Sequence, residues 1–148
     1  MNTPDYKNTA LTWFDQNPAT YLTDYLFCFS QLTIVVYLRY KVNKIPSENN
    51  PNYDQQKTLL WFVAAYNLWL GLGFGIGGLH HNLYDMTKGR VLSNRIYWKI
   101  AVFSAAMSIP FAIIVPVLQV VFIETKKLKI IKLVVVVVAV LYALQCVP

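Results

Sequence analysis

The sequence predicts an all-α, polytopic membrane protein, a single transmembrane domain built as a bundle of four helices. Two observations lead to this prediction. Of the 148 residues, 56% are hydrophobic and only 14% are charged, and the mean hydropathy is +0.41, whereas a soluble domain usually carries about 25% charged residues. The apolar residues are also gathered into four long runs, at residues 20–40, 58–79, 96–123 and 130–148.

The first two runs are each long enough for one membrane-spanning helix, because crossing the bilayer core takes about 20 apolar residues. The run 20–40 carries Asp24 near its start and Gln31 near its middle. It follows a polar stretch that lacks a basic region, and it has no small-residue cleavage signature, so it is not a signal peptide. The run 58–79 is apolar almost throughout and ends in glycines.

The third run, 96–123, is long enough to cross the bilayer with tilt. Pro110 and Pro116 each remove a backbone donor inside it, so we expect one or two kinks. The last run, 130–148, is barely long enough and reaches the end of the sequence. Because a native C-terminus usually has polar residues after its last span, this ending favours a chain that continues beyond Pro148.

The basic residues lie mostly between the apolar runs, and the net charge is +6. Anionic lipid headgroups explain this pattern better than nucleic acid, which we do not expect as a partner. Of the lysines and arginines, eight fall in the first and third loops and five on the side of the N-terminus. The positive-inside rule therefore places those two loops in the cytoplasm or the matrix. The inner mitochondrial membrane is one location that fits.

The third loop holds a cluster of lysines that suits contact with anionic lipid, at roughly 1 kcal/mol for each charge near such a surface. The alternative is the ordinary positive flank of a membrane span. The cluster comprises Lys126, Lys127, Lys129 and Lys132.

The second run ends in a glycine-rich segment. Its G-x-G-x-x-G spacing matches a dinucleotide fingerprint, but neither the required strand before it nor the acidic residue about 20 positions later is present. The same glycines form overlapping GxxxG pairs, which let a neighbouring helix approach closely. We therefore predict a close-packing segment on a central helix, formed by Gly71, Gly73, Gly75, Gly77 and Gly78.

Polar residues are expected to gather where the first two runs meet the side of the N-terminus. One carboxylate lies about one turn inside the first run, and two histidines and a second carboxylate lie at the end of the second run. A carboxylate in hydrocarbon is costly and normally has a partner. Imidazole and carboxylate groups suit zinc binding or proton transfer, whereas a structural ion pair is the alternative. The residues of this cluster are Asp24, His80, His81 and Asp85.

The segments TYLTDYLFCF and LGFGIGGLHHNLYD, followed by an aromatic and basic start of the third run, resemble the N-terminal part of an uncharacterised family of seven-helix membrane proteins. More distantly they resemble the CREST superfamily, which includes alkaline ceramidases and relatives of the adiponectin receptors. The resemblance covers about residues 20–115. It implies an early acidic residue at Asp24 and an early histidine at His80 or His81, within a three-histidine zinc site that hydrolyses lipid amides.

The sequence departs from this pattern in two places. Gly77 and Gly78 stand where the resemblance leads us to expect a serine, and no histidine follows His81 to supply the late H-x-x-x-H pair. A complete zinc hydrolase site therefore cannot be built from these 148 residues.

We accordingly expect a non-catalytic integral membrane subunit, or packing partner, of a larger membrane protein assembly. No complete catalytic constellation is present in the sequence, so we expect no catalytic residue and no cofactor. A bound zinc ion is the alternative. The expected partners are membrane lipids and other integral membrane proteins. The alternative is the N-terminal portion of a CREST-like, metal-dependent lipid hydrolase or receptor-like protein.

Overall fold

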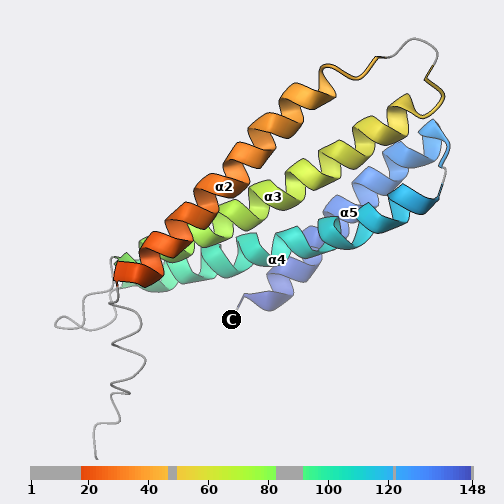
Figure 1. Cartoon of the computed structure of the whole chain (residues 1–148). Helices are drawn as coiled ribbons and strands as arrows, with labels where there is room; N and C mark the ends of the chain where they lie inside the picture. The colour runs from red at the N-terminus through yellow and green to blue at the C-terminus, as the bar shows by residue number, and fades with distance from the viewer. Residues whose placement is uncertain (1–17, 47–49, 83–91, 122, 148) are drawn as a thin grey trace, which may run out of the picture.

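The computed structural model describes residues 18–46, 50–82, 92–121 and 123–147. Within these ranges the chain forms four α-helices and no strand, namely α2 (Pro18–Val42), α3 (Tyr53–Asn82), α4 (Leu92–Val120) and α5 (Thr125–Cys146) (Figure 1). Each helix is long and apolar enough to cross a membrane. The prediction of an all-α fold with four membrane-length helices is confirmed.

All four helices begin earlier than the apolar runs of the sequence, and the difference is largest for α3 and α5. α3 begins at Tyr53 rather than near residue 58, and α5 begins at Thr125 rather than near residue 130. Hydropathy marks only the part of a helix that lies in hydrocarbon, whereas good helix formers such as Lys, Gln and Leu extend the helix beyond it. The lysines that follow Thr125 therefore lie on the first turns of α5 and not in a loop.

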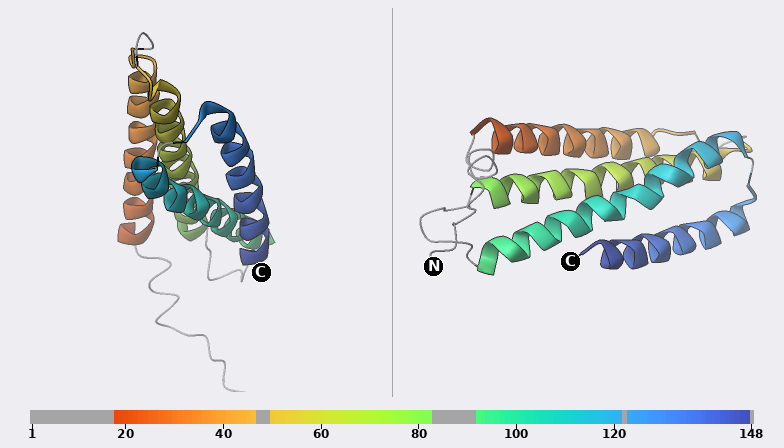
Figure 2. Two further views of the ribbon diagram at one scale, coloured as in Figure 1. Left: turned by 90° about the vertical axis from the view of Figure 1, so that its right-hand side faces the viewer. Right: turned by 90° about the horizontal axis from the view of Figure 1, so that it is seen from below.

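The helices run alternately up and down, and α3 lies between α2 and α4 (Figures 1 and 2). α5 packs chiefly against α4 and only slightly against α3. Within the described residues, α2 packs against α3 alone. α2 and α5 therefore lie at opposite edges of the molecule, as Figure 2 shows, and the four helices form an open arrangement rather than a closed bundle.

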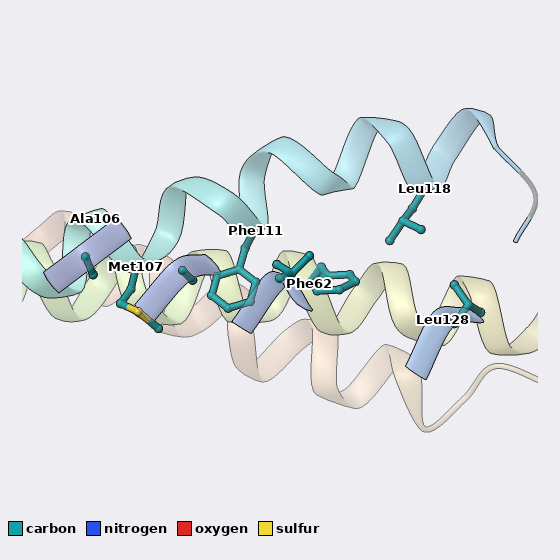
Figure 3. Close-up of a cluster of buried hydrophobic side chains, with 9 residues drawn as sticks. Phe62, Ala106, Met107, Phe111, Leu118 and Leu128 are labelled. Atoms are coloured by element: carbon teal, nitrogen blue, oxygen red, sulfur yellow. The ribbon is translucent and has the colours of Figure 1, made fainter. Parts of the chain in front are cut away.

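The buried core lies between α3, α4 and α5 (Figure 3). Its least exposed large side chains are Phe62 of α3 and Phe111 and Leu118 of α4, and the ring centres of the two phenylalanines are 6.1 Å apart. α5 contributes one helical face, because its buried residues recur at intervals of four and seven. These residues are Leu128, Val135, Ala139 and Ala143. None of the buried core residues in the described chain comes from α2.

The side chain of Gln55, near the start of α3, joins this helix to the end of α4 and to the residues that follow α4. Its amide nitrogen donates to the carbonyl oxygens of Leu118 and Val121, both at 2.7 Å. Its amide oxygen accepts from the backbone nitrogen of Ile123 at 3.0 Å. The last carbonyls of a helix have no partner within that helix, so a side chain that binds them caps it. Gln55 therefore caps α4 and holds its end against the start of α3.

Candidate functional site

Three of the glycines predicted to pack lie on the face of α3 that meets α2. Gly71, Gly75 and Gly78 are spaced by four and three residues, so they share one side of the helix. A Cβ atom added at these positions would lie 3.0, 2.8 and 3.0 Å from the nearest atoms of α2. The facing side chains, in the same order, are Gln31, Cys28 and Asp24. Because α2 contributes nothing to the buried core, this close approach is its main attachment.

The other two glycines behave differently from each other. A Cβ atom on Gly73 would lie 3.0 Å from the backbone nitrogen of Ala105 and 3.2 Å from the backbone oxygen of Ala101. The absence of a side chain at Gly73 therefore lets the backbone of α4 pack closely against α3. A Cβ atom on Gly77 would meet no heavy atom of the described residues within 4 Å. Among the described residues Gly77 therefore packs against no neighbouring helix, although it lies four residues from Gly73, and its role in packing stays a prediction.

The approach at Gly78 brings Asp24 of α2 next to the end of α3. The Oδ2 atom of Asp24 lies 4.0 Å from the Nε2 atom of His81, and both side chains are largely shielded, with 18% and 17% of their surface exposed. This distance is longer than a direct hydrogen bond, so the two side chains are close polar neighbours without a direct bond between these atoms. The expected juxtaposition of Asp24 with one of the two histidines is present.

The two histidines point to different neighbours, because successive residues on a helix are about 100° apart. His81 faces Asp24 on α2, whereas the ring of His80 lies 5.5 Å from the ring of Trp98 on α4. Asp85, the fourth member of the predicted cluster, lies outside the described residues. Among the residues that the structure does describe, no three His, Cys, Asp or Glu side chains gather as metal ligands. They therefore do not fit the zinc site that the resemblance implies.

The lysines predicted as one lipid-binding group are divided by the helical geometry of α5. Lys129 and Lys132 are three residues apart and face a groove between helices. Lys126 and Lys127 are exposed and do not line this groove, and the ammonium of Lys127 lies 3.4 Å from the carboxylate of Glu124. The single polybasic group predicted from the sequence is thus two separate pairs.

The groove that Lys129 and Lys132 face, hereafter the basic groove, lies between α2 and α5 on a floor formed by α3 and α4. It has a volume of about 630 Å³. Arg39 of α2 and Lys57 of α3 join the two lysines at its charged end. The ammonium of Lys132 also lies 5.7 Å from the ring centre of Trp61. The rest of the lining is mainly apolar and includes Val35, Leu68, Trp69, Met107, Phe111 and Val136.

A second hollow, hereafter the small-residue groove, lies between α3, α4 and the end of α5. Its volume is about 700 Å³, and small side chains of α4 form part of its lining. The hydroxyl of Ser108 donates to the carbonyl oxygen of Ala105 at 2.6 Å, so this polar group is satisfied within its own helix. Tyr66 and Leu70 of α3 and Cys146 of α5 complete the groove.

The fold and these surfaces define a class of protein with four membrane-length helices in an open arrangement and two largely apolar grooves between them. Within that class, the chain belongs to DUF6962, a family of unknown function, whose model matches residues 19–147. No curated protein and no solved structure matches the chain.

Proposed function

We propose that the protein is a non-catalytic integral membrane subunit, whose small-residue groove receives a transmembrane helix of a larger membrane protein assembly. The observation that carries this proposal is the apolar groove beside Ala105, Ser108 and Ala112 of α4. Inside a membrane, helices associate through close packing of small residues, since lipid tails are as apolar as the side chains they cover. The proposed role requires no cofactor.

The glycines of α3 support this role less directly than the sequence suggested. Gly71, Gly75 and Gly78 face α2, and Gly73 faces α4, so these four positions are used within the chain. A partner helix must therefore use another surface. The hydroxyl of Ser108 is bonded within α4, so this polar group can face an apolar helix without being left unsatisfied.

Photocrosslinking in native membranes tests this proposal. A photoreactive residue at position 112, which is exposed in the groove, should give one discrete crosslinked protein, identified by mass spectrometry and reproduced from the partner's side. The same residue at position 36 is the control, because Val36 is 70% exposed on α2, at the opposite edge of the molecule. Lipid adducts alone at position 112, from folded protein, would contradict the proposal. Fractionation of the same membranes tests the inner mitochondrial membrane as the location.

One observation favours a second candidate, the N-terminal portion of a CREST-like lipid hydrolase or receptor-like protein. Asp24 and His81, which match the early acid and early histidine of that pattern, lie 4.0 Å apart although 57 positions separate them. The site would need further ligands, since the described residues supply no cluster of three.

Two measurements on the natural protein test this second candidate. Its intact mass, compared with the mass of residues 1–148, establishes whether more chain follows, and the downstream coding sequence shows whether an H-x-x-x-H pair is encoded there. Elemental analysis should then find about one zinc per chain, and Asp24→Leu should reduce it. Folded natural protein that contains no zinc would refute this candidate.

A further inference from the structure

The basic groove has an excess of positive charge. Arg39, Lys57, Lys129 and Lys132 line it, and the one carboxylate among the described lining residues belongs to Asp54. The Oδ2 atom of Asp54 accepts a hydrogen bond from the hydroxyl of Thr125 at 2.9 Å.

None of these four cations forms a salt bridge with a carboxylate of the described residues, whose ion pairs lie elsewhere. Lys57 lies 3.4 Å from the phenol oxygen of Tyr53, and Lys132 lies near the ring of Trp61. Both contacts are with uncharged groups, and the single carboxylate of Asp54 offsets only one of the four positive charges, so the groove keeps a net positive charge. An anion placed among them would be stabilised by all four.

The groove continues from these charges into the hydrocarbon layer. Its floor follows α3 from Lys57 to Trp69, a distance of about 18 Å at 1.5 Å per residue. This is more than half of the roughly 30 Å thickness of a bilayer core. Beyond the charged end the lining is apolar, with Leu68, Met107 and Val136 at its deeper part. A ligand that fills the groove therefore has a charged end and a long apolar tail, which free phosphate lacks.

We propose that the basic groove binds an anionic glycerophospholipid, with its phosphate among the four cations and one acyl chain along α3. Charge complementarity identifies the headgroup, and the position of the groove in the membrane identifies the tail. Arg39 suits the phosphate because a guanidinium donates two parallel hydrogen bonds to it. Trp61, at the mouth of the groove, has the amphipathic ring that prefers the headgroup level. The inference requires no partner subunit and is therefore independent of the assembly proposed above.

The divided lysines of α5 provide a matched test. We compare Lys129→Gln/Lys132→Gln with Lys126→Gln/Lys127→Gln, because both pairs remove two charges from the same turns of the same helix. Native mass spectrometry of the purified full chain measures the binding of phosphatidylglycerol and of zwitterionic phosphatidylcholine. The wild type should prefer phosphatidylglycerol. The groove pair should weaken that binding about 10- to 30-fold, as expected for two lysines beside an anionic group, and the control pair less than about threefold.

Two further arms distinguish a lipid site from a phosphate site. Ala64→Trp places a large ring in the apolar groove while all four cations remain, and it should also release phosphatidylglycerol. Inorganic phosphate at the same concentration should not displace the lipid. Equal losses from the two lysine pairs would show a non-specific surface effect and overturn the proposal. Displacement by inorganic phosphate, or unchanged binding in a folded Ala64→Trp variant, would overturn it as well.

Discussion

Gly73→Ala should destabilise the protein although it improves the intrinsic helix propensity of α3. The added methyl group would lie 3.0 Å from the backbone nitrogen of Ala105, 3.2 Å from its Cα and 3.2 Å from the carbonyl oxygen of Ala101. All three are backbone atoms, so no side chain can rotate away. α3 and α4 would have to separate, which would also disturb the core that these helices share.

Gly77→Ala makes the matched control, because it introduces the same methyl group into the same helix four residues later. A Cβ atom there meets nothing within 4 Å among the described residues. Replacing a helical glycine by alanine gains up to about 1 kcal/mol in propensity at both positions, so that gain cancels when the two variants are compared. The remaining difference is the cost of overpacking, about 1–3 kcal/mol.

Thermal unfolding in one detergent, followed by circular dichroism, measures this difference. For a chain of this size, 1 kcal/mol corresponds to roughly 2–4 °C in Tm, so Gly73→Ala should melt about 2–12 °C below Gly77→Ala. Gly77→Ala itself should melt at or above the wild type. If Gly73→Ala melted at or above Gly77→Ala, the close contact between α3 and α4 at this glycine would be refuted.

Three further predictions concern the two ends of the molecule. Gln55→Ala removes three hydrogen bonds and should cost about 1–3 kcal/mol of stability in detergent. Gln56→Ala is the control and should cost little, because it loses one exposed hydrogen bond. Equal melting temperatures of the two variants would contradict this prediction. Asp24→Asn should be nearly neutral, because the amide keeps a polar group about 4.0 Å from the imidazole of His81, whereas Asp24→Leu removes that group and should cost about 1–3 kcal/mol. Similar stabilities for the two variants would argue against this contact. Single cysteines at positions 50 and 126, without the two native cysteines, should react with an impermeant reagent from the same side of the membrane, and labelling from opposite sides would refute the topology.

The fold was largely predictable because hydropathy and helix length are properties of the sequence alone. The central position of α3 followed from its glycines, because a helix face without side chains makes few contacts with lipid and packs better against other helices. The proximity of Asp24 to the histidines followed from depth, because both lie near the same membrane surface. Neither inference required knowledge of the rotation of any helix about its axis.

The basic groove could not be predicted, because it depends on that rotation. Its cations come from three helices, and Arg39 and Lys57 stand at opposite ends of one loop in the sequence. The spacing of Lys129 and Lys132, three residues apart, indicates that they share one face of a helix. This was not recognised, because the lysines were assigned to a loop. The different surroundings of Gly73 and Gly77 could not be predicted either, because the sequence does not reveal which side of α3 meets α4 at each level.

Gln55 also sets an order of events during biogenesis. Its partners Leu118 and Ile123 lie 63 and 68 residues later in the chain, so these bonds form only after α4 has been synthesised in full. Until then the end of α4 has uncapped carbonyls. α5 begins two residues after Ile123, so its direction is set when this amide engages. The α5 side of the basic groove is therefore joined to α3 late, through Gln55 and through the hydrogen bond from Thr125 to Asp54.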